Sequence, residues 1–374
     1  MKRLRFMMIG GFLGAGKTTA IARLARHYAD RGLRVAIVTN DQAFGLVDTQ
    51  SLRAQGFKVG EVTGACFCCK FNDLVSTVER LAEGERPDIV LAEPVGSCTD
   101  LVATVVEPLK HLYQDRFETA PVVVLLKPEH GQKILGDDPA CGFSPKAAYI
   151  FLKQIEEADM VAVNKLDKLS PADAESLLAV VRRRFPDKRV VGVSARSGDG
   201  FQAIIETLDA PAPIRTRTPE VDYDIYAEGE AELGWLNCEA RLIRPAGIDS
   251  NVQVSLDELV LTLVRRLSQA LAKAGAEPAH LKIMGTSGDD NAIANLVASS
   301  DGAELSLVSG AKVTDVDLTI NARVAIAPEE LVTIVERVVA VVASLHTLRF
   351  EISNMQSFRP GRPVPTHRMA LGQV

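Results

Sequence analysis

Residues 11–18, with the sequence GFLGAGKT, limit the possible folds more than any other part of the chain. They follow an apolar run at 4–9 that predicts a buried strand, and they precede an amphipathic stretch that predicts a helix. Glycines at such a junction let backbone N–H groups surround phosphates, and the helix dipole favours the anion. The alternative is an ordinary glycine-rich turn, but the final Lys-Thr pair favours a nucleotide-binding phosphate loop.

In this loop the ammonium group of Lys17 is expected to neutralise the β- and γ-phosphates, and the hydroxyl of Thr18 is expected to bind Mg²⁺. The residues assigned to the triphosphate are Gly11, Gly14, Ala15, Gly16, Lys17, Thr18 and Thr19.

Up to about residue 208, short β-branched runs alternate with longer amphipathic stretches, which predicts an α/β domain whose doubly wound, mostly parallel sheet has helices on both faces. Residues 127–145 mix Gly, Pro and Asp without periodicity and predict a surface loop. The predicted strands are 4–9, 34–39, 58–62, 88–92, 121–126, 160–163 and 189–193.

A second, smaller domain is predicted after a proline-containing linker at 209–220. Its pattern is βαββαβ, the split-βαβ or ferredoxin-like arrangement, with a shorter strand pair around Leu305 and Val313. Ser255 and Glu258 predict a capping box at the start of its first helix. The predicted divisions are therefore 1–208, 209–220, 221–358 and a basic tail at 359–374.

The charge distribution predicts no nucleic-acid partner, because the net charge is -6 and the basic residues are scattered. No uncharged apolar run approaches the ~18 residues of a membrane span, so no membrane partner is expected. Residues 1–8 combine positive charge with apolar residues as a secretory leader does, but a glycine-rich loop follows instead of a cleavage site. We therefore expect a cytoplasmic protein.

Residues 164–167, with the sequence NKLD, predict the base specificity of the nucleotide site. They follow a predicted strand and so lie at the carboxyl edge of the sheet, where open α/β folds bind ligands. An Asp carboxylate there can accept hydrogen bonds from guanine N1–H and the amino group, a donor pair that adenine lacks. The nucleotide expected is GTP, and the residues assigned to guanine are Asn164, Lys165, Asp167, Ser194 and Ala195.

Glu93 ends a predicted apolar strand and is assigned to Mg²⁺, with Gly96 close to the γ-phosphate. A strand-terminal Glu in solvent is the alternative. Asp41 is a second candidate ligand of Mg²⁺, and Asp48 is a weaker one. Lys17, Thr18 and Glu93 are the residues to which we assign catalysis.

Three of the six cysteines, Cys66, Cys68 and Cys69, lie within four positions. Clustered thiolates favour Zn²⁺ and also bind Co²⁺. Two other readings stay open: a thiol redox pair of Cys66 and Cys69, or three small buried residues. The candidates for a fourth ligand are water, a nucleotide oxygen, Asp41, Glu61, Cys98 and His130.

Taken together, the phosphate loop, the Cys-x-Cys-Cys run, Glu93-x-x-Gly96 and the NKLD motif resemble the CobW-like family of metal-chaperone GTPases, relatives of the GTPases that insert nickel into hydrogenase and urease. Ala65 and Asp41 stand where members of that family usually carry Gly and Glu. The resemblance implies that Mg²⁺-GTP stabilises a metal site on the cysteines and that hydrolysis releases Zn²⁺ or Co²⁺ to a client metalloprotein.

We expect weak GTPase activity, because no residue that would activate the attacking water is recognisable in the sequence. A GTP-dependent assembly or activation factor for a corrinoid or other metalloenzyme is the alternative, followed by a thiol redox protein. The sequence leaves a homodimer open.

Overall fold

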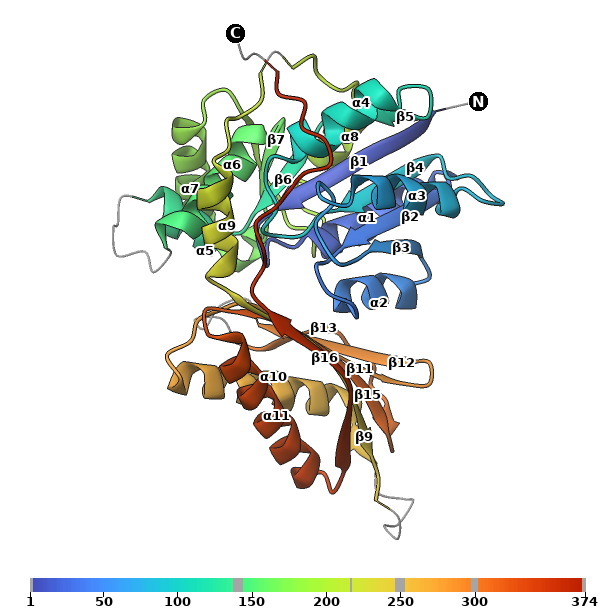
Figure 1. The fold of residues 1–374 in the computed structure, drawn as a ribbon, viewed down its shortest axis with the longest axis vertical. Helices are drawn as coiled ribbons and strands as arrows, with labels where there is room; N and C mark the ends of the chain where they lie inside the picture. The colour runs from blue at the N-terminus through green and yellow to red at the C-terminus, as the bar shows by residue number, and fades with distance from the viewer. Residues whose placement is uncertain (1–2, 137–143, 216, 246–252, 297–301, 372–374) are drawn as a thin grey trace. The chain divides into compact units, whose positions relative to one another are not determined.

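The computed structural model describes residues 3–136, 144–215, 217–245, 253–296 and 302–371, and it divides the chain into two compact units (Figure 1). Unit 1 contains Met1–Gln42, Gly56–Gly229 and Arg362–Val374, and unit 2 contains Ala43–Gln55 and Glu230–Gly361. The chain therefore leaves unit 1 after its second strand, returns to it, and comes back a last time with the C-terminal segment. The predicted linker at 209–220 and the boundaries beside it stay predictions.

Unit 1 is built on a parallel sheet with the strand order β3-β2-β4-β1-β6-β7-β8, and β5 also pairs with β1. The predicted parallel α/β sheet is confirmed. Its strands are β1 (Leu4–Gly11), β2 (Val35–Asn40), β3 (Lys58–Val62), β4 (Ile89–Glu93), β5 (Phe117–Thr119), β6 (Val123–Leu126), β7 (Met160–Val163) and β8 (Arg189–Gly192).

Every residue of β4, β6 and β7 is buried, as expected for strands covered on both faces. Two helices of this unit have the same start, a serine whose side chain accepts a backbone N–H and a proline in the first turn. The helices are α1 (Lys17–Asp30), α3 (Phe71–Leu81), a π-helical segment (Val102–Val106) leading into α4 (Glu107–Leu112), α5 (Pro128–Leu135), α6 (Pro145–Glu157), a 3₁₀ turn (Leu166–Lys168), α7 (Pro171–Arg184), α8 (Gln202–Asp209) and α9 (Tyr223–Ala231).

Unit 2 has an antiparallel sheet with the strand order β13-β12-β11-β15-β9-β16. Four of these strands, in the order β16-β9-β15-β11, form with two helices the predicted ferredoxin-like βαββαβ arrangement. The elements are α2 (Val47–Ala54), β9 (Gly234–Ile243), β10 (Val254–Ser255), α10 (Leu256–Lys273), β11 (Pro278–Ser287), β12 (Asp290–Leu296), β13 (Glu304–Leu307), β14 (Lys312–Val313), β15 (Val316–Val324), α11 (Pro328–Leu345) and β16 (Arg349–Phe358).

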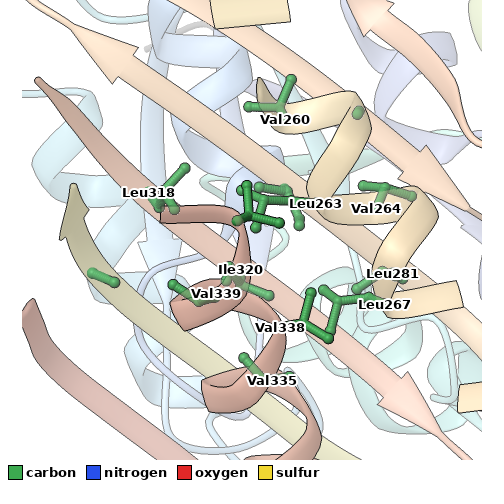
Figure 2. Packing of buried hydrophobic residues seen from close by; sticks show 14 of the residues in the cluster. Val260, Leu263, Val264, Leu267, Leu281, Leu318, Ile320, Val335, Val338 and Val339 are labelled. Carbon is green, nitrogen blue, oxygen red and sulfur yellow. The ribbon is translucent and has the colours of Figure 1, made fainter. Parts of the chain in front are cut away.

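The core of unit 2 lies between its sheet and the helices α10 and α11. Figure 2 shows side chains of α10, such as Leu263 and Leu267, among those of the strands and of α11, such as Ile320 and Val338. The backbone N–H of Glu258 donates to the Ser255 hydroxyl (3.4 Å), as a capping residue requires. Neither helix, nor any other in the described part of the chain, is long and apolar enough to cross a membrane.

Helix α2 belongs to unit 2, although its sequence lies between two strands of the parallel sheet. Val47 packs with Met284, whereas Ile283 belongs to the core beneath α10 and α11. Successive strand residues point to opposite faces, so α2 covers the face of the sheet away from those two helices. Lys282 forms an ion pair with Asp48, and the Asn321 side chain accepts the N–H of Val47 (2.7 Å).

Two expectations about these elements were wrong. Residues 127–145 were expected to form a loop, but they contain the helix α5 and the start of α6, while 137–143 lie outside the described residues. Leu305 and Val313 were expected on paired strands, but Leu305 pairs with Ala294 of β12 and Val313 with Val254. Strand β12 was not predicted, because a short stretch of mixed apolar and polar residues such as DNAIANL does not by itself distinguish a strand from other structure.

Candidate functional site

The phosphate loop connects β1 to the first turn of α1, as its sequence predicts. Gly16 has φ of +93°, a conformation that favours glycine, and a Cβ there would lie 2.4 Å from Nδ2 of Asn164. The Lys17 side chain is buried, and its Nζ donates to the carbonyl of Gly11 (2.9 Å). The loop therefore places an ammonium group and the N-terminus of a 14-residue helix at one point, which suits a polyphosphate.

Thr18, in the first turn of α1, meets Glu93 at the carboxyl end of β4. Strand β4 pairs with β1 in parallel, so Glu93 at its end lies near the loop that follows β1. The Thr18 hydroxyl donates to Oε1 of Glu93 (2.9 Å), and the Glu93 side chain is buried. A hydroxyl and a carboxylate side by side are oxygen ligands of the kind that Mg²⁺ binds.

The segment after β4 packs directly on the phosphate loop. A Cβ on Gly96 would lie 2.8 Å from the Leu13 side chain and 3.1 Å from Leu13 Cα. The side chain of Gln154 holds this segment by donating to the carbonyls of Gly96 (3.0 Å) and Cys98 (2.8 Å). A displacement of residues 93–98 would therefore also displace the phosphate loop.

Asn164 connects the phosphate loop to the loop that follows β8. Its Nδ2 donates to the carbonyl of Ala15 (2.8 Å), and its Oδ1 accepts the N–H of Ala195 (2.8 Å). Asp167 is exposed in the 3₁₀ turn Leu166–Lys168, beyond Lys165 with φ of +62°. Of the predicted guanine-binding residues, Asn164 is thus buried and joins two loops, whereas the carboxylate of Asp167 is open to solvent.

Cys66, Cys68 and Cys69 bring their sulfur atoms together in the turn between β3 and α3. The Sγ of Cys66 lies 2.8 Å from that of Cys68 and 3.3 Å from that of Cys69, and the remaining pair is 3.7 Å apart. All three sulfurs lie within 4.8 Å of one another, so they can hold one metal ion. Cys66 and Cys68 are buried and Cys69 is partly exposed.

Contacts among the thiols shift their pKa values in opposite directions. Hydrogen bonds with Cys68, Cys69 and Cys98 hold the pKa of the Cys66 thiol well below its usual value, against the opposing effect of burial. The contact with Cys66 raises the pKa of Cys68, and it raises the pKa of Cys69 to about 11. Of the three thiols, Cys66 is therefore the one whose surroundings lower its pKa.

Asn40, which the sequence analysis did not single out, anchors the cysteine turn. It ends β2, its Nδ2 donates to the carbonyls of Val62 (2.9 Å) and Ala65 (2.8 Å), and its Oδ1 accepts the N–H of Phe67 (2.7 Å). The sequence offered one signal for Asn40, because it is a polar residue between an apolar strand and Asp41. Asn40 positions the turn through backbone contacts and is not itself placed among the sulfurs.

The C-terminal segment is a second feature that the sequence analysis did not connect with the cysteines. The N–H of Val364 donates to the Sγ of Cys69 (3.2 Å), and the N–H of Thr366 donates to the carbonyl of Cys68 (2.8 Å). The ring of His367 packs edge-on against Phe71, with centroids 5.0 Å apart. The predicted basic tail thus lies along the cysteine turn.

Of the two aspartates considered for Mg²⁺, Asp41 is buried directly after β2, and its Oδ1 accepts the N–H of the next residue (2.7 Å). Asp48 lies in α2 of unit 2, where it forms the ion pair with Lys282. The assignment of individual ligands to magnesium stays a prediction.

This fold and this site define a P-loop nucleotide-binding protein with a cluster of thiols in the same unit. The family model described as CobW/HypB/UreG, nucleotide-binding domain, matches residues 5–191, which is half of the chain. The chain belongs to this family, and the predicted family resemblance is confirmed.

Several curated relatives carry the names of zinc chaperones. The chain is 27% identical over 203 residues to zinc chaperone YeiR of Escherichia coli (strain K12), covering 52% of this chain and 57% of that protein. It is 29% identical over 213 residues to zinc chaperone CobW of Pseudomonas aeruginosa, covering 48% of this chain and 52% of that protein. The match thus spans about half the length of these relatives.

A solved structure of the hydrogenase maturation factor HypB from Archaeoglobus fulgidus is similar over 55% of this chain and 88% of its own, with 18% identity and a TM-score of 0.38. At this score the likeness has no bearing on the site.

Proposed function

We propose that this protein binds and slowly hydrolyses GTP and acts as a metallochaperone that carries Zn²⁺ or Co²⁺ to a client metalloprotein. The observation that carries the proposal is the presence of two donor sets in unit 1. One is the Thr18–Glu93 pair beside the phosphate loop, and the other is the three-sulfur cluster between β3 and α3. Because β3, β2, β4 and β1 are consecutive in a parallel sheet, the loops after them share one edge.

In the nucleotide site, Lys17 and the loop amides would bind the triphosphate, and Thr18 and Glu93 would hold Mg²⁺, with Asp41 as a further candidate. The ion, when bound, neutralises charge on the transferred phosphoryl group. The protein contributes position and electrostatics, so slow intrinsic turnover is expected. Asp167 would select guanine through its carboxylate.

At the thiol cluster, the three sulfurs are soft donors that suit Zn²⁺ and Co²⁺. The names of the relatives favour zinc as the cargo. The segment 93–98 packs on the phosphate loop and also contains Cys98, whose thiol contacts Cys66, so nucleotide binding and metal binding have a structural route for coupling.

The experiment is a calorimetric titration of the full chain with Zn²⁺, with and without Mg²⁺ and a non-hydrolysable GTP analogue. We expect one metal per chain, tighter binding with the nucleotide, and loss of binding in the triple variant Cys66→Ser, Cys68→Ser, Cys69→Ser. Asp167→Ala should keep metal binding while reducing the preference for GTP over ATP. Equal affinity for both nucleotides in the unmodified protein would refute the guanine assignment, and full metal binding by the triple variant would refute the cargo site.

The short contact between Cys66 and Cys68 (2.8 Å) also suits a dithiol–disulfide couple. A reversible disulfide with a defined potential, formed in protein that binds no metal, would favour this second function.

A further inference from the structure

The C-terminal segment 363–371, which we call the strap and which is red in Figure 1, contacts the cysteine turn without forming a helix or strand. Cys66 and Cys68 are 3% and 1% exposed, so Cys69 is the sulfur of the cluster that is partly open to solvent. The strap lies against this sulfur, because the N–H of Val364 donates to the Sγ of Cys69 (3.2 Å). A metal ion that enters or leaves the three sulfurs would therefore meet the strap at Cys69.

We propose that the cysteine turn and residues 100–103 form a docking surface for an extended, arginine-bearing segment of the client, and that the strap occupies this surface as an autoinhibitory contact until the client displaces it. The inference rests on the proposed function, since it takes the three sulfurs as the site of a Zn²⁺ or Co²⁺ cargo. The chemistry of the client segment is that of the strap, which the surface already binds.

The strap meets the turn as an extended peptide does. Val364 and Thr366 both direct their N–H groups at the turn, and the N–H of Thr366 donates to the carbonyl of Cys68 (2.8 Å). In an extended chain, groups two positions apart face the same side. The Thr366 hydroxyl also donates to the carbonyl of Cys69 (3.0 Å). Two of these three contacts use main-chain donors, so another extended segment can make them.

Prolines prepare the strap for this conformation. Pro363 and Pro365 lie on either side of Val364 and have no N–H of their own, which leaves residues 364 and 366 as the donors. A residue before proline favours extended backbone, so Arg362 and Val364 are restricted to it before the strap binds. Ordering such a segment costs less than ordering a flexible one.

A buried carboxylate gives the docking surface its preference for a cation. Asp100 is 1% exposed, and its carboxylate accepts from the Nε of Arg368 (2.7 Å) and from the hydroxyl of Tyr223 (2.7 Å). Removing the cation from a buried carboxylate leaves an uncompensated charge. Release of the strap into solvent is therefore unfavourable, whereas exchange for another segment with a guanidinium group is not. For this reason we assign an arginine to the client segment.

Beyond Arg368 the strap continues along unit 1. The N–H of Met369 donates to the carbonyl of Ala103 (2.8 Å), and the N–H of Leu371 donates to the hydroxyl of Thr218 (3.2 Å). Pro363 is the one buried residue of the strap, so its displacement exposes little apolar surface. The strap is thus held mainly by polar contacts that a competing segment can replace.

The test uses the full chain and two pairs of variants. Val364→Pro removes the N–H that meets Cys69, whereas Val364→Ala keeps it and shortens a side chain that is 70% exposed, so this pair isolates the N–H. Arg368→Ala removes the cation on Asp100. Its matched control is Arg362→Ala, which removes a nearby arginine whose partner, Asp224, lies on α9.

Hydrogen exchange of the metal-free protein measures the contact of the strap without reference to a cargo. The amides of Thr366 and Met369 should exchange about 10-fold faster or more in Arg368→Ala than in the unmodified protein, because the strap opens more often. Arg362→Ala should match the unmodified protein.

Fluorescence anisotropy of a labelled peptide with the sequence of residues 360–371 tests the surface in trans. The peptide should bind Arg368→Ala at least about 10-fold more tightly than the unmodified protein, where the tethered strap competes at high effective concentration. The same peptide carrying Arg368→Ala should bind this variant at least about 10-fold more weakly, because it supplies no cation to Asp100.

The loaded protein then tests autoinhibition. Transfer of Zn²⁺ to an excess of chelator should be about 10-fold faster or more in Arg368→Ala than in Arg362→Ala, and faster in Val364→Pro than in Val364→Ala. A saturating concentration of the peptide should restore slow transfer in Arg368→Ala, because the peptide then covers Cys69.

The outcomes separate this inference from the proposed function. Equal amide exchange in Arg368→Ala and the unmodified protein, or no binding of the peptide to Arg368→Ala, would overturn the docking surface. Equal rates of Zn²⁺ transfer from all variants would overturn autoinhibition. Absence of any metal binding would overturn the proposed function instead, and the exchange and peptide measurements would still decide on the docking surface. If circular dichroism shows that Arg368→Ala does not fold, Val364→Pro takes its place, since it keeps the pair of Arg368 and Asp100.

Discussion

Replacing Asn40 with alanine tests whether a residue outside the sulfur set determines metal affinity. Asn40 is 4% exposed and makes three hydrogen bonds to the segment that carries the cysteines. Asn40→Ala removes all three bonds and adds no bulk. The turn then keeps its sulfurs but loses the side-chain hydrogen bonds that join it to the end of β2.

The size of the effect follows from these contacts. Each buried hydrogen bond contributes about 1 kcal/mol net, and leaving a buried donor such as the N–H of Phe67 without this acceptor costs about 1–3 kcal/mol more. For three such bonds we therefore expect a loss of about 4–6 kcal/mol in the free energy of unfolding. If about 1.4 kcal/mol of this must be recovered to order the turn around an ion, Zn²⁺ affinity falls about 10-fold.

The assay combines urea unfolding with a competitive Zn²⁺ titration against a chromophoric chelator, under conditions where the variant is folded. Leu267→Ala serves as the control, because this buried residue of α10 should cost about 2–5 kcal/mol without affecting the cysteine turn. Unchanged Zn²⁺ affinity in a destabilised Asn40→Ala protein would show that the turn is ordered without Asn40.

Two further predictions concern the phosphate loop and a buried carboxyl. Gly16→Ala should weaken binding of a fluorescent GTP analogue by about 10-fold or more, because the new Cβ would lie 2.4 Å from the Asn164 side chain at φ of +93°; equal binding would show that the loop adjusts freely. Burial raises the pKa of Glu157 to about 8, so the folded protein retains a proton that the unfolded chain releases above its usual value near 4.5. Stability should therefore fall as pH rises between these values, by up to about 1.4 kcal/mol per pH unit. Glu157→Gln should flatten this dependence in urea unfolding at pH 5.5 and 8, and an unchanged slope would contradict the assignment.

Much of unit 1 could be predicted from the sequence because its signals are local. The strand, the glycines and the Lys-Thr pair of the phosphate loop are adjacent in the chain. The positive φ angles of the loop fall on its own glycines, so no distant residue is needed to form it. The cysteine cluster is local for the same reason, since a turn of four residues brings its sulfurs together. The βαββαβ pattern of unit 2 is similarly readable, because each element carries its own apolar periodicity.

Other features depend on contacts between distant residues. Helix α2 has an ordinary amphipathic sequence, and only the folded chain shows that it covers the antiparallel sheet of unit 2. Cys98 is separated from Cys66 by 32 positions, and Val364 is separated from Cys69 by 295.

The phosphate loop, the cysteine turn and the types of the two sheets can be predicted from the amino-acid sequence alone, because they follow from backbone geometry and periodicity within short stretches. The contacts of Asn40, Cys98 and the C-terminal segment with the cysteine turn become evident only in the folded chain. The physical reason is that such contacts depend on the path of the whole chain, and no spacing or periodicity in the sequence specifies that path.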